Sequence, residues 1–432
     1  MQPSDTVDFL GRTYRVGPEA EVLIGRSRAS MLWLPWAAMA AVGVLQYGYG
    51  ALVPHLVDRG WRLTDALWLL ALWTVFQAGA GFPAAYLRER GRIGPRATML
   101  TGAALVTVGP LALAHGSGIV ALLGYSVLSG TGAGLVYATC TSTVAKWYPE
   151  RSAAKVSTVT AAFAYGTVPF AVAFVFAPGT VALDVTAVIV GLVVAGTGLL
   201  FQDPPPNWWP PHVDPRTWAL NGPRAVRQYS AGEAAHTGVL ALMYLILFGA
   251  SAVSLFDVTF FALLGNRLNA GLVVIAVGTG LLLGTNGAGR AVAIRVSDRI
   301  GRHRTIARVL TILGIGQICF AGAAKSGSVT VLLLSALLAG AGGGAFYPLF
   351  ASLAREYFGE RSAVETNAVV YSAKAFGGVL GVGLAALVTP AWGFATVFLI
   401  AGGLALGSAA VCARLRQPGR TLILPNSVAR LT

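Results

Sequence analysis

A lysine interrupts an otherwise apolar stretch, Val369-Val370-Tyr371-Ser372-Ala373-Lys374-Ala375-Phe376-Gly377-Gly378. The surrounding residues, from about Thr366 to Val388, have the composition of a membrane-spanning helix. Placing a lysine at this depth costs roughly 2.5–3.5 kcal/mol, so an intramembrane lysine is first a candidate for a functional site. Helical spacing puts a polar stripe on one face, formed by Asn367, Tyr371, Lys374 and Gly378. We expect this stripe to face the interior of a helix bundle.

The composition of the whole chain is that of a polytopic membrane protein. Of its 432 residues, 55% are hydrophobic and 11% are charged, whereas soluble domains have about 25% charged residues. The net charge of +14 would suit a nucleic-acid-binding protein, but the cations lie at the ends of apolar segments. We therefore expect the lipid bilayer as the surroundings and no nucleic-acid partner.

Twelve apolar spans are long enough to cross a hydrocarbon core of about 30 Å. They centre near Ala40, Leu72, Val106, Leu135, Ala164, Ile189, Leu247, Leu281, Ile315, Leu338, Leu380 and Ala401. If the amino terminus lies inside, the outer loops hold only the cations Arg59, Arg62, Arg267 and Lys325. The positive-inside rule then predicts a multi-pass protein of the inner (cell) membrane with both termini in the cytoplasm.

A proline-rich segment at 203–211 divides the spans into two groups of six. Dense proline stops helices and favours a stiff, extended linker. The predicted organisation is a cytoplasmic amino-terminal arm at 1–31, a six-helix bundle at 32–201, a cytoplasmic linker at 202–236, a second bundle at 237–413 and a cytoplasmic tail at 414–432.

The two halves carry the same motifs at a constant offset. Adding 210 to the positions of Gly130, Gly132, Gly134 and Tyr137 gives Gly340, Gly342, Gly344 and Tyr347. The same offset carries Glu150-Arg151-Ser152-Ala153 onto Glu360-Arg361-Ser362-Ala363. The sequence therefore predicts an all-α membrane protein of twelve transmembrane helices, in two six-helix halves related by a parallel repeat, with its site between the halves.

The segment Ser297-Asp298-Arg299-Ile300-Gly301-Arg302 resembles the loop signature of the major facilitator superfamily. Within that superfamily, the chain resembles the oxalate:formate antiporter family, close to bacterial monocarboxylate transporters. The matching pieces are Leu45-Gln46-Tyr47, Gly94-Pro95-Arg96, Gly134-Leu135-Val136-Tyr137, Lys146-Trp147-Tyr148-Pro149, Asn286-Gly287-Ala288-Gly289-Arg290 and Tyr371-Ser372-Ala373-Lys374. This resemblance implies that Arg290 and Lys374 bind the carboxylates of the substrate.

Arg290 is a second cation within a span. Helix rise places Arg290 about 12 Å and Lys374 about 13 Å from the cytoplasmic ends of their spans, so the two cations lie at similar depth in the bilayer. Two cations at one level repel each other unless an anion lies between them, and arginine can hold a carboxylate with two parallel hydrogen bonds. The alternative is a structural role, with backbone carbonyls as partners or with the arginine extending to the membrane surface. Both repeat counterparts are uncharged. The counterpart of Lys374 at the offset of 210 is Ala164, and that of Arg290 is Pro83 at a neighbouring offset of 207, which carries Arg92-Ile93-Gly94 onto Arg299-Ile300-Gly301.

The amino-terminal half would then supply an aromatic and hydrogen-bonding wall, for which ordinary helix packing is the alternative. The remaining candidates for substrate binding are Gln46, Tyr47, Tyr137, Phe163, Tyr165, Asn286 and Tyr371. In the second half, glycines 340 and 344 stand where oxalate-selective relatives carry bulky aromatic residues. We expect these glycines to enlarge the cavity and to favour a larger or singly charged carboxylate.

Asp257 is the one acid well inside a span, and it shares a helix face with Ser254 and Phe261. Burial pushes such an acid toward protonation, so it is a candidate for proton coupling. The alternatives are a counter-ion for Arg290 or Lys374 and a residue of the outer vestibule. For gating, the candidates are the charged residues at the loops after spans two and eight, Glu89, Arg92, Asp298, Arg299 and Arg302.

The chain contains no pattern for an enzyme, a cofactor or a metal. Its three cysteines are unrelated in spacing, and the glycine-rich runs at 130–134 and 340–344 lie within apolar spans, where they suit close helix approach. We expect a monomeric secondary active transporter of small organic carboxylates, with a monocarboxylate favoured and an oxalate-type dicarboxylate as an option. Proton symport and exchange (antiport) both stay open. The alternatives are a drug or metabolite efflux carrier of the same fold and, in another class, a non-transporting sensor or scaffold.

Overall fold

The computed structural model describes residues 5–9, 12–221, 225–359 and 363–419. Glu360, Arg361 and Ser362 of the second repeat motif lie outside the described residues. In the described part, eleven helical runs are long and apolar enough to cross a membrane. The last of these covers Glu365–Arg414, 50 residues, and Gly393 breaks it with φ 74° and ψ 157°. This run therefore contains two of the twelve predicted spans, and the prediction of an all-α membrane fold is confirmed.

The first half consists of six spans, several of which are interrupted. The first contains α2 (Ser30–Tyr47) and α3 (Tyr49–Asp58), and the next two are α4 (Leu63–Glu89) and α5 (Pro95–His115). The fourth is made of α6 (Gly118–Ala121), the π-helical segment η1 (Leu122–Ser129) and α7 (Gly130–Trp147). The short η2 (Pro149–Arg151) precedes the fifth span, α8 (Ser152–Tyr165) with α9 (Thr167–Phe176), and the sixth is α10 (Thr180–Leu199). Helices dominate because a membrane offers no other partner for backbone N–H and C=O groups.

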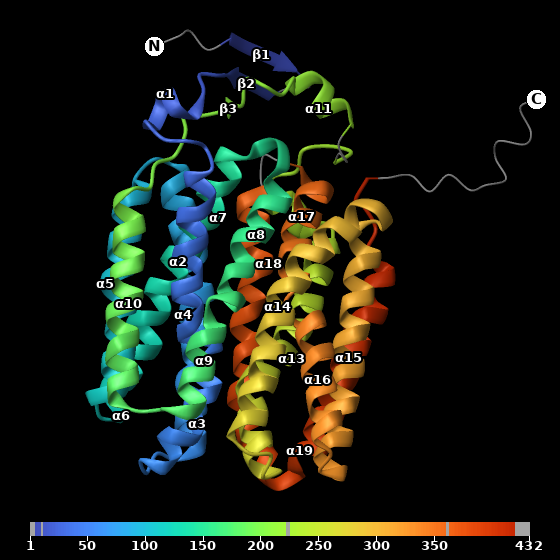
Figure 1. Ribbon diagram of the computed structural model, residues 1–432. Coiled ribbons are helices and arrows are strands. Elements are labelled where there is room, and N and C mark those ends of the chain that lie inside the picture. The colour runs from blue at the N-terminus through green and yellow to red at the C-terminus, as the bar shows by residue number, and fades with distance from the viewer. Residues whose placement is uncertain (1–4, 10–11, 222–224, 360–362, 420–432) are drawn as a thin grey trace, which may run out of the picture.

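The second half repeats this plan. Its first three spans are α13 (Val239–Arg267), α14 (Leu272–Ile300) and α15 (Arg302–Ser326). The fourth is α16 (Val329–Gly343) with α17 (Phe346–Phe358). The final run consists of α18 (Ala363–Gly378), the π-helical η3 (Val379–Leu384), α19 (Ala385–Val411) and η4 (Cys412–Arg414). Figure 1 shows the two halves side by side, blue to green for the first and yellow to red for the second.

Glycines allow the helices of each half to approach closely. In the first half, a Cβ on Gly130 would lie 2.8 Å from the Trp73 carbonyl oxygen of α4, and one on Gly132 would lie 2.9 Å from the Gly102 oxygen of α5. Side chains cannot be accommodated at such separations, so the small residues set the distance between these helices.

A small cap covers one end of the first half, and we call this end of the molecule the capped end (Figure 1). Strands β1 (Asp5–Phe9) and β2 (Arg12–Val16) form an antiparallel hairpin, and β3 (Trp208–Trp209) pairs in parallel with β2, opposite Arg15 and Val16. The cap also contains α1 (Ala20–Ile24) and α11 (Pro215–Asn221). The proline-rich segment therefore contributes a strand, which its composition did not indicate.

The linker is attached to both halves. Near its start, the Trp147 indole donates to the Gln202 carbonyl oxygen at 2.7 Å. Near its end, the Tyr229 N–H donates to the Phe358 oxygen of α17 at 2.9 Å, shortly before α12 (Ala231–His236). The first part of the linker thus belongs structurally to the first half, and the last part to the second half.

Candidate substrate site

Lys374 lies in the interface between the halves, and its side chain is almost fully buried, with the residue 3% exposed. Its ammonium group donates three hydrogen bonds to neutral oxygens: Gln46 Oε1 of α2 at 2.9 Å, Gln77 Oε1 of α4 at 3.0 Å and Tyr371 Oη of α18 at 3.3 Å. Two of these partners belong to the first half. The lysine, from the second half, therefore connects the two bundles.

Arg290 of α14 connects the halves in the same way and is 2% exposed. Its guanidinium donates to the Thr160 carbonyl oxygen of α8 at 2.7 Å, to Tyr47 Oη of α2 at 2.8 Å and to Asn286 Oδ1 at 3.1 Å. The backbone oxygen of Arg290 accepts a hydrogen bond from Ser157 at 2.8 Å. The backbone carbonyl of Thr160 is a partner of the kind expected if Arg290 has only a structural role. Three of these four contacts, however, come from the opposite half.

Aromatic rings surround both cations. The ring of Tyr347, on α17, lies 5.5 Å from Arg290 Cζ and 5.8 Å from Lys374 Nζ. Phe163 lies 5.6 Å from the lysine nitrogen and Tyr47 lies 5.9 Å from the arginine carbon. At these distances the negative ring faces attract the cations, although they do not neutralise them.

The positive charge of the cluster has no acidic partner among the described residues. In the described part of the chain, no ion pair joins Arg290 or Lys374 to a carboxylate. Three potential donors, Arg290 Nε, Gln46 Nε2 and Tyr347 Oη, are buried there without a hydrogen-bond partner. Buried donors and charges without partners are costly, and an anion bound between them would satisfy both.

The predicted substrate-binding residues mostly come together here. Tyr137 stacks on Tyr371 at 4.9 Å and meets Phe163 at 6.2 Å, which places it beside the groups already described. Tyr165 lies elsewhere, 38% exposed and with its ring against Gly287. The cluster also contains two residues that were not predicted, Gln77 and Tyr347. The repeat held a signal for Tyr347, because its counterpart at minus 210 is Tyr137.

Asp257 of α13 does not join the cation cluster. It is 1% exposed, and its Oδ2 accepts a hydrogen bond from Gln317 Nε2 of α15 at 2.9 Å. Asp257 Oδ1 and Gln317 Oε1 are both buried, and neither has a hydrogen-bond partner within the described ranges. Neither a counter-ion contact nor exposure in an outer vestibule is seen for this acid within the described residues, so it does not reduce the local positive charge of the cluster by direct pairing.

The expected enlargement of the site by glycines 340 and 344 is wrong. A Cβ on Gly340 would collide with the Leu282 carbonyl oxygen, and one on Gly344 would collide with Asn286. Both glycines therefore lie against α14 rather than along an open space. Their small size brings α16 close to α14, and the aromatic residue that reaches the site from this part of the chain is Tyr347.

The predicted gating residues form separate clusters in the two halves. Asp298 pairs with Arg302 at 2.6 Å, and Arg302 also pairs with Glu356 at 2.8 Å, all within the second half. In the first half, Lys146 pairs with Glu89 at 3.1 Å. Arg92 and Arg299 take part in none of these described ion pairs. Asp298 therefore pairs within its own half, and no ion pair joins it to the opposite half among the described residues.

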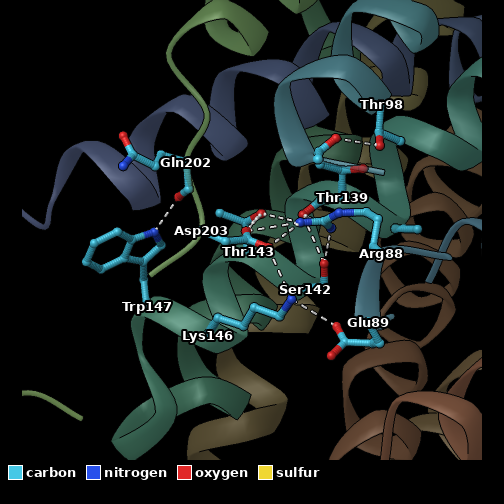
Figure 2. Close-up of polar contacts among 12 residues, drawn as sticks. Arg88, Glu89, Thr98, Thr139, Ser142, Thr143, Lys146, Trp147, Gln202 and Asp203 are labelled. Atoms are coloured by element: carbon cyan, nitrogen blue, oxygen red, sulfur yellow. Dashed lines mark hydrogen bonds and ion pairs between the residues drawn. The ribbon is translucent and has the colours of Figure 1, made fainter. Parts of the chain in front are cut away.

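Figure 2 shows how the linker completes the cluster of the first half. Asp203 lies between two cations, 2.9 Å from Arg88 Nη2 and 3.1 Å from Lys146 Nζ, and it accepts a hydrogen bond from Thr143 at 2.8 Å. Burial opposes ionisation of Asp203, but the two cations and the threonine hydroxyl hold the pKa of this carboxyl below its usual value. The ion pairs therefore attach the start of the linker to α4 and α7.

A cavity between the halves opens toward the capped end. Its empty volume is about 1010 Å³, including the part that meets solvent, and it is bounded by α4, α7, α8, α17 and α18. The halves are in close contact on the other side of the cation cluster, where a Cβ on Gly50 would collide with the Val258 carbonyl oxygen of α13. The described structure is therefore accessible from the capped end and closed at the opposite end.

Comparisons with known proteins agree with this architecture. The family model of the Major Facilitator Superfamily matches residues 35–324 and 259–428. The chain is 24% identical over 368 residues to a protein named oxalate:formate antiporter from Oxalobacter formigenes, which covers 84% of this chain and 85% of the relative. A crystal structure of the peptide transporter POT, a mutant in complex with sulfate, superimposes with a TM-score of 0.66 at 16% identity, covering 89% of this chain and 94% of that one.

The structural likeness to the peptide transporter shows the fold alone, because the sequence identity is low. The family match, in contrast, covers most of the chain, and both relatives are transporters rather than enzymes. With its two six-helix halves and a charged cluster between them, this chain belongs to the Major Facilitator Superfamily of membrane transporters.

Proposed function

We propose that this protein is a secondary active transporter of small organic carboxylate anions that works by alternating access. The observation that carries the proposal is the pair of buried cations, Arg290 and Lys374, which have only neutral partners in the described structure. An anion is the ligand that this charge distribution favours. The likeness to an oxalate:formate antiporter supports the same class of substrate.

The geometry suggests how substrate binding and conformational change could be linked. Two carboxamide oxygens, from Gln46 and Gln77, accept hydrogen bonds from Lys374. A carboxylate oxygen is a stronger acceptor for an ammonium group, so the substrate would displace these oxygens and release contacts between the halves. Ligand binding then changes the relative stability of the two conformations, as alternating access requires.

The coupling mechanism has two forms, exchange of one carboxylate for another and cotransport with a proton. Asp257 remains our candidate for carrying a proton, since its carboxyl group is buried against the neutral amide of Gln317. A protonated Asp257 could donate from Oδ1 to Gln317 Oε1, and this would satisfy both of the atoms that have no hydrogen-bond partner in the described structure. Asp298 and Arg302 remain candidates for controlling closure at the capped end, which we expect to be the cytoplasmic side.

The proposal is tested by counterflow in reconstituted vesicles, using labelled carboxylates of one to six carbons. We expect Lys374→Ala and Arg290→Ala to abolish counterflow of the transported carboxylate while the purified variants remain folded. Lys325→Ala is the control, because Lys325 is an exposed cation near the end of α15. Counterflow by the Lys374 and Arg290 variants at the wild-type rate would refute the assignment of the site.

A further inference from the structure

The cavity at the capped end has mostly apolar walls made of small side chains. Alanines from all five of its helices contribute, including Ala78, Ala138, Ala145, Ala153, Ala351 and Ala368. The one charged side chain in the described lining is Arg355 of α17, which donates a hydrogen bond to Ser152 across the interface between the halves. No carboxylate belongs to this described lining. The cavity is therefore wide, largely apolar and without negative charge.

This cavity adjoins the candidate substrate site. Gln77, Tyr137 and Tyr371 line the cavity, and the same three residues enclose the lysine. Gln77 accepts from Lys374 through Oε1 at 3.0 Å and donates from Nε2 to the Tyr371 hydroxyl at 3.2 Å. A single layer of side chains thus separates the cavity from the Lys374 ammonium group.

The apolar walls of the cavity favour solutes with a hydrocarbon part over small hydrated anions. A small, strongly hydrated anion gains nothing from alanine side chains, because it has no apolar surface to bury. A hydrocarbon tail does gain, and each buried methylene strengthens binding by roughly threefold to fourfold. The empty space of the cavity, about 1010 Å³ including the part that is open to solvent, leaves room for such a tail.

We propose that the cavity holds the apolar tail of the substrate, whose carboxylate reaches the Lys374 and Arg290 cluster past Gln77 and Tyr371. This inference rests on the proposed carboxylate transport and makes the substrate class narrower. The preferred ligands are carboxylates with a hydrocarbon chain of several carbons or an aromatic ring, rather than formate or oxalate.

Two glycines of α4 provide a matched test. Gly81 lines the cavity, and a Cβ added to it would meet no atom within 4 Å. Gly81→Leu therefore places a side chain in the cavity without displacing a helix. Gly79 lies two residues earlier, is exposed on the helix surface and also has free space around its Cβ position. Gly79→Leu makes the same chemical change on the same helix outside the cavity.

The experiment is isothermal titration of the purified wild type and both variants with acetate, butyrate, hexanoate and phenylacetate. For the wild type and Gly79→Leu, we expect the Kd to fall roughly threefold to fourfold per added methylene. For Gly81→Leu, hexanoate and phenylacetate should bind at least tenfold more weakly than to the wild type, while acetate binds equally to all three proteins.

Two results would overturn the inference but leave carboxylate transport in place: wild-type protein that binds hexanoate no more tightly than acetate, or equal losses in the two leucine variants. Failure of all four carboxylates to bind the wild type would overturn the proposed function together with the inference. Because partition into detergent is the same for all three proteins, the difference between Gly81→Leu and Gly79→Leu isolates the cavity.

Discussion

Lys374 and Gln46 lie in opposite halves of the protein, and the lysine ammonium group donates a 2.9 Å hydrogen bond to the glutamine carboxamide oxygen. The glutamine is fully buried, and its Nε2 has no hydrogen-bond partner in the described part of the chain. The contact therefore satisfies one donor of the lysine without neutralising its charge. A neutral acceptor at this position leaves the lysine able to attract an anion.

Replacing this acceptor with a carboxylate should mimic a bound substrate. We expect Gln46→Glu to pair with Lys374, to raise the Tm of the purified protein and to reduce carboxylate counterflow to background, because the site charge is then partly neutralised. The measurements are a thermal melt and vesicle counterflow. Normal counterflow by this variant would show that the charge of Lys374 is not needed for transport.

Tyr347 offers a test of a single hydroxyl group. Its ring contacts both cations, while its buried Oη has no hydrogen-bond partner among the residues that the structure describes. If this hydroxyl donates to the substrate, Tyr347→Phe should weaken substrate binding by roughly 1.5–3 kcal/mol, as for hydrogen bonds to charged groups. The loss of an unpaired hydroxyl should leave the Tm unchanged or slightly higher.

The matched control is Tyr165→Phe, which makes the same change at a residue 38% exposed and outside the cluster. We expect its carboxylate affinity, measured by titration, to equal that of the wild type. Equal affinities for Tyr347→Phe and Tyr165→Phe would argue that Tyr347 contributes only its ring.

A variant of Asp257 can distinguish proton cotransport from carboxylate exchange. We expect Asp257→Asn to abolish accumulation driven by a pH gradient and to spare substrate exchange at equal pH, because asparagine resembles the protonated acid permanently. The hydrogen bond from Gln317 can persist to the asparagine Oδ1, so the fold should be retained. Vesicle uptake with and without an imposed pH gradient checks both parts. A variant that still accumulates substrate along the gradient would make Asp257 a structural residue.

Asp203 should stabilise the protein in a pH-dependent way. Because its pKa in the folded protein lies below the usual value, its contribution is present above the unfolded-state pKa of about 3.9 and is lost as the pH falls through the folded-state pKa. We expect Asp203→Asn to lower the Tm at pH 7, since Arg88, with a side chain 1% exposed, loses its ion-pair partner.

The difference in Tm between the wild type and Asp203→Asn should begin to shrink as the pH is lowered below about 4, where protonation of the unfolded chain starts to favour unfolding, and it should be lost once the pH falls through the folded-state pKa. Asp58→Asn is a suitable control, because Asp58 is exposed and has no ion pair in the described structure. A Tm difference that stays constant down to pH 3 would show that the charge of Asp203 is not the source of the effect.

The sequence alone determined the number of spans, the repeat and the two intramembrane cations. Apolar length, internal similarity and depth along a helix can all be read in one dimension, because each helical residue advances by about 1.5 Å. Lys374 and Arg290 were found in this way, and the prediction that glycine runs bring helices together is supported by the close approach of Gly130 and Gly132 to neighbouring helices.

The tertiary structure decided which side each residue faces and what it meets. Tyr165 and Phe163 are two positions apart on α8, yet only Phe163 reaches the cations. Asp257 faces Gln317 rather than the cations, and Gln77 completes the coordination of Lys374 from a helix more than 290 residues away in sequence. These outcomes depend on helix rotation and on the distance between helices, both of which are set by packing across the whole bundle and not by any one segment.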